Sequence, residues 1–473
     1  MYIHGIKKRE VPTSLTPPIV STAGLVVAVG KAPIHLAKNP AKVNRPTLCY
    51  TYDEAVEQFG YSDDWEKYSL CEVMYSHFVL YNMAPLVLVN VLDPETTSTE
   101  VENMPVAFKG DEALIDEPDM LTDTLVLLAG EEELERDVDY IGSRDDEGNI
   151  KITALTPKAK KDVTASFDKV TPEAVTKEDI VGGIDMETLE PKGLETVDLV
   201  FPLTRLVPGV LIAPGYSHHP DVGAVMTAKM SNINSHFTGI ALTDADPSIR
   251  RYTDIPKWKE DNSYTAKEQM VLWPKVQLGD RVFHMSTHIA GVINKTDAAN
   301  GGIPYNSPSN KELQANGLVT EEGHEIVLAP DQASYLNGQG VMTGLNFIGG
   351  WRAWGNRTGA YPGQSDPKDT FLSVRRMFDW VGNTLILTFW QKIDDPTNRR
   401  FIDSIVDSAN IWINSLTPEY LLGGRVEFRR EDNPTTDLMD GKVKFRVFMT
   451  PPSPAREIEF IQEYDPSYMD GLF

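Results

Sequence analysis

The chain has 473 residues, a formal net charge of −25 at pH 7 and a hydrophobic content of 41%. That apolar fraction is enough for several folded cores, and the length predicts about two to four domains. The acidic balance argues against nucleic acid as a direct partner, because phosphate binding requires clustered Lys and Arg side chains.

Cysteine usage and apolar runs predict the compartment. Cys49 and Cys71 form no CxxC pair, which is typical of a cytosolic chain without a disulfide framework. The segment from Met1 to Glu10 is charged and leads into no apolar signal-peptide core. Apolar runs such as Leu86–Val89 are far shorter than the ~20 residues that span a bilayer. We therefore expect neither a signal peptide nor a membrane partner.

The first 94 residues predict an α/β segment. Residues 1–22 are polar, contain prolines and have no clear period. Gly24–Gly30 is typical of a buried strand, and Thr51–Glu54 has the form of a helix capping box, with Gly60 ending that helix. A second helix is expected from about residue 66 to 82, followed by a buried strand at 86–92.

Composition changes near Pro94, where the chain becomes acidic and rich in Thr, Val and turn residues. Leu125–Leu128 is typical of a strand, and Ile150 and Ile152 alternate after a turn signal. We interpret this block as a small β-domain inserted into the α/β fold. Its acidic run Glu131–Glu133 favours a solvated edge over a cation site.

The α/β pattern then returns. A strand ends at Leu211–Gly215, His218–Asp221 begins a helix expected to reach about Phe237, and Thr238–Asp244 is the next strand and turn. Further buried segments surround Leu272 and Ile289–Ile293.

The C-terminal third predicts two long helices and a hairpin. The first helix, at about 371–391, is expected to bury Phe378, Val381, Leu385 and Phe389. The second is expected to begin after an Asp395-Pro396 cap. Its apolar stripe comprises Ile402, Ile405, Ala409, Trp412 and Leu416. The hairpin comprises Val426–Arg429 and Val443–Phe448, joined through Asp440-Gly441.

Catalytic and ligand-binding motifs are scarce. The sequence has no GxxxxGK[ST], HExxH or GxSxG pattern. His218 and His219 are adjacent and would not face one metal on a helix. Trp354–Thr358 invites a phosphate-loop interpretation, but a packed turn in which Arg357 bonds to backbone or to an acid is favoured. We predict no catalytic, cofactor or metal site.

Several motifs in a fixed order carry a family resemblance. An apolar strand precedes an aromatic-Gly-x-Arg-Thr turn, a V-R-R-hydrophobic-F-D-aromatic helix start follows, and a P-x-x-P-A segment closes the chain. The corresponding residues are Gly344–Ile348, Trp354–Thr358, Ser373–Trp380 and Met449–Ile458, with Val27–Pro33, Tyr52–Gly60 and Ala290–Asp297 upstream. Together they resemble the contractile tail sheath family of phage tails and related injection machines, over most of the chain.

Two departures from the family pattern concern the chain ends. The Gly-Val-Tyr-x-Glu-Glu motif common in the N-terminal arm is not present in residues 1–22. Arg456 stands between Ala455 and Glu457, where the family usually has Ala-Glu directly.

The resemblance implies a mixed α/β (α+β) multidomain fold with an inserted small β-sandwich-like domain and extended terminal arms. The implied divisions are an N-terminal linking arm (1–22), the first part of the α/β core (23–94), the inserted β-domain (95–195), a central α/β domain (196–365), a C-terminal α/β domain (366–454) and a C-terminal linking arm (455–473).

The resemblance also implies a structural role without enzymatic activity. Such subunits stack as hexameric rings around an inner tube, exchange arms with neighbours, and contract to drive the tube through a cell envelope. Implied partners are further copies of the chain, the inner tail tube protein, and baseplate and tail terminator proteins, with no cofactor, nucleic acid or membrane. The implied location is the bacterial host cytoplasm during assembly, and then a virion tail or tail-like particle.

The resemblance singles out residues for assembly. Arg375 and Arg376 are predicted to face the tube, because they form a basic pair on an acidic chain. The arms are expected to link subunits through apolar side chains, namely Val11, Leu15 and Ile19 at one end and Ile458, Phe460 and Ile461 at the other.

Two other functions remain open at this point. One is an α/β enzyme acting on a carbohydrate or a phosphorylated ligand, with its site near Asp297, Arg357 and Asp379. The other is a tail tube or baseplate protein, against which the length and the α/β content count.

Overall fold

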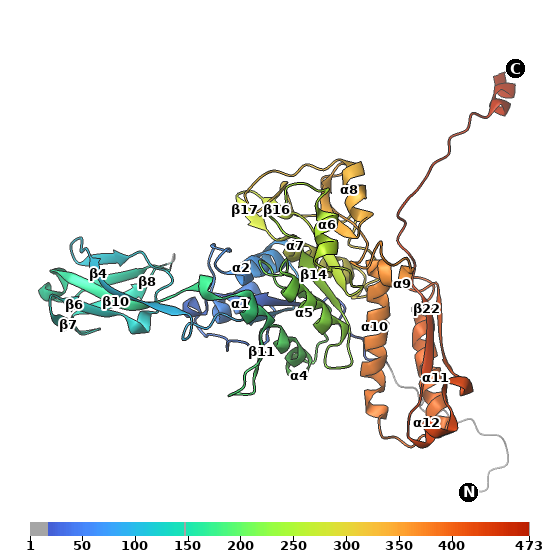
Figure 1. Ribbon diagram of the computed structural model, residues 1–473, viewed down its shortest axis with the longest axis horizontal. Coiled ribbons are helices and arrows are strands. Elements are labelled where there is room, and N and C mark those ends of the chain that lie inside the picture. Colours follow the sequence, from blue (N-terminus) through green and yellow to red (C-terminus); the bar gives the residue numbers. More distant parts are fainter. Residues whose placement is uncertain (1–17, 146–147, 473) are drawn as a thin grey trace, which may run out of the picture.

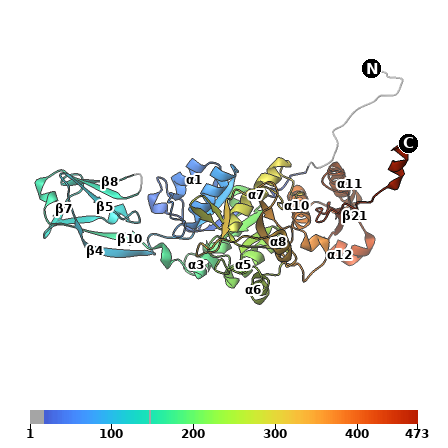
Figure 2. The same cartoon turned by 90° about the horizontal axis from the view of Figure 1, so that it is seen from above.

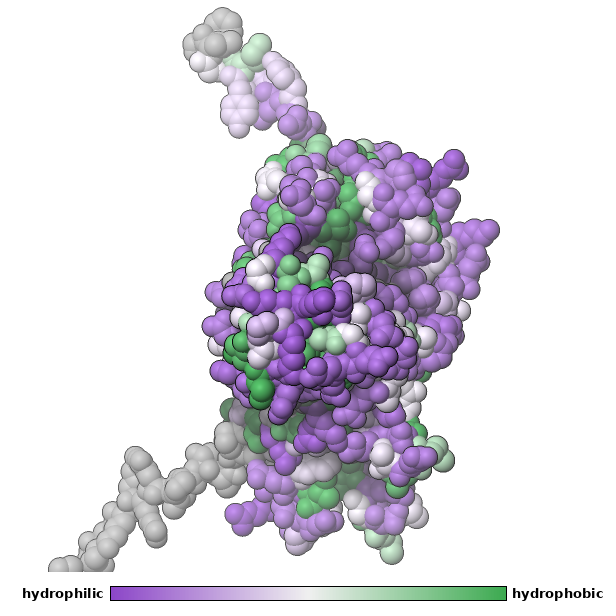
Figure 3. All heavy atoms as spheres, turned by 90° about the vertical axis from the view of Figure 1, so that its left-hand side faces the viewer, coloured by the Kyte–Doolittle hydropathy of each residue, from purple (hydrophilic) through white to green (hydrophobic). Residues whose placement is uncertain are grey.

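The computed structural model describes residues 18–145 and 148–472. A β-lobe, a central α/β lobe and a helical lobe lie in a row, and the C-terminal segment extends away from the body (Figures 1 and 2). Viewed from the β-lobe end, the surface is mostly hydrophilic, with scattered apolar areas (Figure 3). The predicted fold class, mixed α/β with an inserted β-domain, is confirmed.

An eight-stranded sheet organises the central lobe. Six neighbouring strands are parallel, and one antiparallel strand closes each edge. The strand β1 has the sequence VVAVG and is buried throughout, as expected where helices cover both faces of a parallel sheet. The order is β2 (Thr47–Cys49), β3 (Leu86–Asn90), β1 (Val26–Gly30), β13 (Val210–Ile212), β14 (Ile240–Asp244), β15 (Gln269–Leu272), β19 (Val341–Asn346) and β20 (Trp351–Trp354).

Alternate residues of β1 divide between two cores. Val26 and Ala28 enter one, and Val27 and Val29 enter the other. Helices of the first core are α1 (Tyr52–Phe59), α2 (Ser69–Met74), α6 (Ile255–Asp261), α7 (Met285–Ala299) and α8 (Pro330–Asn337); those of the second are α3 (Lys177–Val181), α4 (Val200–Thr204) and α5 (Pro220–Ser231). Two minor sheets flank them, β17 (Arg281–Phe283) with β16 (Lys275–Leu278) and β18 (Gly317–Val319), and β11 (Gly183–Ile184) with β12 (Pro191–Lys192).

Two helices end earlier than the sequence predicts, and the backbone conformation shows where. The helix expected at 66–82 is α2 followed by a π-helical segment, Tyr75–Leu80, and it stops before Asn82, whose φ is +51°. α5 ends at Ser231 rather than near Phe237, because Asn232 leaves the helical conformation with φ −156°, and the positive φ values of Asn234 and Ser235 keep the chain from resuming the helix.

The inserted lobe is a small β-sandwich with its own core. Its four-stranded sheet comprises β4 (Ser98–Val106), β10 (Val163–Val170), β6 (Val126–Ala129) and β7 (Glu132–Leu134), and its three-stranded sheet comprises β5 (Glu112–Ile115), β9 (Ile150–Ala154) and β8 (Tyr140–Arg144). Val175, Ile180 and Leu194 pack instead in the second core of the central lobe. We therefore propose that the insert ends near Val170 and not at residue 195.

The helical lobe combines α10 (Leu372–Phe389), α11 (Arg399–Ser415) and the antiparallel pair β21 (Gly423–Phe428) and β22 (Phe445–Thr450). The expected Asp395-Pro396 cap is wrong, since Asn398 caps α11 by accepting a hydrogen bond from the amide of Phe401. Met377 and Trp380 lie deeper in the lobe's core than Phe378. Two short helices complete it, α9 (Pro367–Thr370) before α10 and α12 (Thr435–Met439) between the two strands.

Candidate assembly interface

The root of the N-terminal arm, here residues 19–23, is hydrogen-bonded along one side of α10. The indole N–H of Trp380 donates to the Ser21 carbonyl at 3.0 Å, and the Ser21 amide donates to Thr384 Oγ1 at 3.1 Å. The Ile19 amide donates to Thr388 Oγ1 at 2.9 Å. Positions four apart lie on the same side of a helix, so a single stripe of α10 fixes the path of the arm root.

A buried ion pair extends this stripe by one turn. The Arg376 guanidinium pairs with both carboxylate oxygens of Asp297 from α7, and it also donates to the Ala23 carbonyl at 3.0 Å. Arg376 is 4% exposed and Asp297 2% exposed. This cluster therefore joins the arm root, the α/β core and the helical lobe at one point.

Arg375 is also committed within the subunit. Its guanidinium contacts Asp379 Oδ1 at 2.7 Å and Asp369 Oδ1 at 3.3 Å. Burial acts to lower the pKa of Arg375, but the carboxylates of Asp379, Glu268 and Asp369 together raise it above its usual value. That Arg375 and Arg376 face the tube stays a prediction. The argument for it, a basic pair on an acidic chain, no longer holds because carboxylates of the same subunit neutralise both charges.

The remaining predicted arm residues fall into three groups. Val11 and Leu15 lie outside the described residues. Ile19 lies beside α10 with its side chain 51% exposed. Ile458, Phe460 and Ile461 are 72–86% exposed on a segment without regular structure up to the short 3-10 helix Pro466–Leu472. The structure therefore anchors the root of one arm and leaves the other extended.

The pair β21 and β22 presents two open edges. Within the described ranges, these strands pair only with each other. Open edges carry unpaired N–H and C=O groups that another extended chain can bond.

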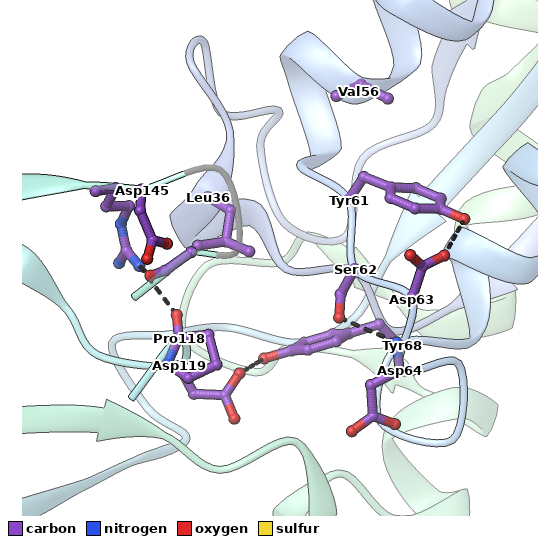
Figure 4. Close-up of a pocket in the computed structure, with 12 residues that line it drawn as sticks. Leu36, Val56, Tyr61, Ser62, Asp63, Asp64, Tyr68, Pro118, Asp119 and Asp145 are labelled. Atoms are coloured by element: carbon purple, nitrogen blue, oxygen red, sulfur yellow. Dashed lines mark hydrogen bonds between the residues drawn. The ribbon is translucent and has the colours of Figure 1, made fainter. Parts of the chain in front are cut away.

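Polar contacts join the β-insert to the central lobe. Tyr68 Oη donates to Asp119 Oδ1 at 2.5 Å, and Lys67 Nζ lies 2.9 Å from Asp119 Oδ2. Burial lowers the pKa of His35 to about 4, so its neutral ring donates to the Pro118 carbonyl at 3.3 Å. Figure 4 shows the Tyr68 ring directed at Asp119 across the floor of a cavity of about 660 Å³. Apolar contacts are also shared, because Val170 belongs to the second core of the central lobe and Leu121 packs against it. Together these contacts fix the orientation of the insert.

The residues of the enzyme alternative do not converge. Asp297 is occupied by Arg376, and Asp379 lines a small cavity beside Trp380. Arg357 lies elsewhere, between the rings of Tyr361 and Phe371, and donates to Thr370 Oγ1 at 2.9 Å. The packed turn favoured from the sequence is therefore confirmed, except that the partners of Arg357 are two rings and a hydroxyl rather than backbone or an acid.

The described part of the chain offers neither a metal-binding cluster nor a membrane-spanning helix. Residues 18–145 and 148–472 hold no group of three or more His, Cys, Asp or Glu side chains placed to bind a metal. Within those ranges, every helix is too short or too polar to cross a membrane.

Sequence reasoning missed the acceptors and donors on α10. Trp380, Thr384 and Thr388 share the four-residue spacing of one helix stripe. The four-residue spacing of these side chains could have been noticed in the sequence. Their partners, Ile19 and Ser21, could not have been predicted, because they lie more than 350 residues away.

Two curated proteins are similar in sequence, one of them over the full length of the chain. No family model matches the sequence. The chain is 24% identical to the tail sheath protein of Burkholderia phage BcepMu over 99% of this chain and 98% of that protein. The major tail sheath protein of Serratia phage KSP20 matches a part, at 25% identity over 44% of this chain and 53% of that protein.

Solved structures share the fold. The sheath of the extracellular contractile injection system PVC in its contracted state matches with a TM-score of 0.59 and 14% identity, covering 99% of both chains. The contracted helical sheath of the anti-feeding prophage matches with a TM-score of 0.58 and 15% identity, covering 98% of this chain and 100% of that chain. Along its whole length the sequence is similar to that of a tail sheath protein, and the chain shares its fold with the subunits of two contracted sheaths.

Proposed function

We propose that this chain is the sheath subunit of a contractile tail or tail-like injection device, and that its role is structural rather than catalytic. The observation that carries the proposal is the extent of the match, because a tail sheath protein and two contracted sheaths each align with at least 98% of the chain. A shared domain alone would align over part of it.

The subunits would stack as hexameric rings around an inner tube protein and meet baseplate and terminator proteins at the ends. Assembly would take place in the bacterial host cytoplasm, and the finished polymer would belong to a virion tail or tail-like particle. Contraction would be a switch between two packings of rigid subunits that stay linked by their arms.

Arm exchange is supported by the open edges of β21 and β22. A strand donated by a neighbour would satisfy their free backbone groups, and its alternate apolar side chains would cover the sheet. The exposed Ile458 and Phe460 have the alternating spacing of such a strand.

Polymer formation by the full chain tests this function. We expect long hollow tubes in negative stain, and loss of tubes when residues 455–473 or 1–17 are deleted. A wild-type chain that stays monomeric at high concentration and at reduced salt would contradict the proposal.

The β-insert is proposed to face outward and to be dispensable for polymerisation. Its terminal strands are adjacent, since Ser98 pairs with Val170. A short Gly-Ser linker can therefore replace residues 99–169 and keep Val170 in the second core, with Tyr68→Phe to avoid an unpaired hydroxyl. Tubes of reduced outer diameter are expected, and absence of tubes would refute the outward placement.

A further inference from the structure

The C-terminal arm leaves the body near α9 (Figure 1). A cavity at the start of this arm is lined in part by Pro454–Glu457. Its volume is about 410 Å³, and its lining comes from four separate parts of the chain: the loop with Ser307 and Ser309, the end of α8, the turn around Arg357, and the arm residues Arg456 and Glu457. Small-molecule sites are lined mostly by apolar side chains. This lining combines Trp354 and Tyr361 with many hydroxyl, amide and guanidinium groups, which suits a charged occupant.

The charges around the cavity leave one guanidinium without a carboxylate. Within the described ranges, Arg357 has no ion pair, and it is held between two rings at 4.3 and 3.7 Å from its guanidinium carbon. Arg456 pairs only with the neighbouring Glu457 at 3.3 Å, and both side chains are mostly exposed. Such a surface pair contributes little to stability, so Arg456 is free to take another partner.

The two arginines also act on each other. Burial lowers the pKa of Arg357 from its usual value, and the positive charge of Arg456 lowers it further. Two like charges facing one cavity repel, and an anion between them removes that repulsion. A planar guanidinium binds a carboxylate with two parallel hydrogen bonds, which makes carboxylate the matching ligand.

We propose that this cavity is a carboxylate-binding site that takes an Asp or Glu side chain of a second copy of this chain. The proposal rests on the proposed function, since a polymer places neighbouring copies at the arm root. Copies of this chain are rich in carboxylates, with 69 Asp and Glu against 44 Lys and Arg. The bound side chain would bridge Arg357 on the body and Arg456 on the arm, and would thereby set the direction in which the arm leaves.

Polymerisation of charge-neutral variants tests the site. Arg456→Gln removes an exposed side chain and should keep the fold, whereas Arg357→Gln also loses its ring contacts. The matched control is Arg399→Gln, whose side chain is 95% exposed on α11. We expect Arg456→Gln to raise the protein concentration needed for tubes about tenfold, with an unchanged melting temperature and no effect of the control. Equal assembly of Arg456→Gln and wild type would overturn the proposal.

Zero-length cross-linking identifies the occupant. Arg456→Lys keeps the positive charge and introduces an amine that carbodiimide couples to a touching carboxylate. In tubes made from mixed 14N- and 15N-labelled chains, we expect cross-linked peptides with one label from each copy. Cross-links to Glu457 alone, or a site that fills with citrate in the unassembled chain but gives no inter-subunit cross-link in tubes, would overturn the assignment to a second copy.

The two proposals fail differently. A wild-type chain that forms no tubes contradicts the sheath function. Tubes that form equally well with Arg456→Gln, and that yield only intramolecular cross-links, contradict the carboxylate site and leave the function intact.

Discussion

The two arms of this subunit begin in opposite ways. The N-terminal arm root lies on α10 and makes backbone hydrogen bonds to four of its side chains, three of them buried polar groups of the subunit core. The C-terminal arm leaves after β22 and exposes its apolar side chains to solvent. Subunit stability should therefore depend on the first arm root and be independent of the second.

The difference also assigns distinct tasks to the two ends. An arm whose root is built into the core moves with the subunit, so its exit point is fixed in every packing. An exposed arm is free to change direction when the subunits rotate. Four sets of substitutions can break this comparison, and their expected effects on the unfolding free energy of the subunit run from large to small.

The largest effect is expected for Asp297→Leu. It leaves the Arg376 guanidinium buried without a counter-charge, which costs about 3–5 kcal/mol. Urea unfolding of the full chain measures this. The double variant Asp297→Leu/Arg376→Met replaces the whole pair by apolar groups and should recover much of the loss, and a double variant no more stable than Asp297→Leu would contradict the buried-pair interpretation.

Thr384→Val should cost about 1–3 kcal/mol, because the Ser21 amide would be buried without an acceptor. Ser21 is 5% exposed, so water does not readily replace the lost bond. Amide hydrogen exchange at Ser21 should accelerate at least tenfold while exchange at α11 is unchanged. Unaltered protection at Ser21 would show that the bond to Thr384 does not hold the arm root.

Thr388→Val is the matched milder change. It also removes an acceptor, here of the Ile19 amide, but this amide is only partly buried and water can take over. We expect a loss of about 0.5–1 kcal/mol. Limited proteolysis before Ser21 should become faster with little change in the unfolding midpoint. A loss of unfolding free energy larger than that for Thr384→Val would contradict the inference that the hydrogen bond to Ser21 matters more than the one to Ile19.

The smallest effect is expected at the other arm. Ile458→Ser, Phe460→Ser and Ile461→Ser together should change stability by less than about 0.5 kcal/mol, because exposed side chains lose no burial. Tube formation should nevertheless be lost. A clear drop in melting temperature of the unassembled variant would mean that the C-terminal arm already packs on its own subunit.

Local sequence signals determined much of the architecture. Runs such as Val26–Gly30, the capping Thr51 and the alternating Ile150 and Ile152 identified strands, a helix start and the inserted β-domain, because burial and capping act within a few residues. The ordered motifs then identified the sheath family.

Tertiary structure alone decided what the charged and polar residues do. Arg376 follows Arg375 in an acidic chain, and the pair appears from the sequence as a basic surface patch. The fold instead brings Asp297 from α7 and the carbonyl of Ala23 to the same guanidinium. Such partners are set by the packing of segments far apart in the chain, and no local pattern encodes them. The same holds for the stripe on α10 and for the cavity between Arg357 and Arg456, since each exists only once the sheet has placed its helices and both arm roots.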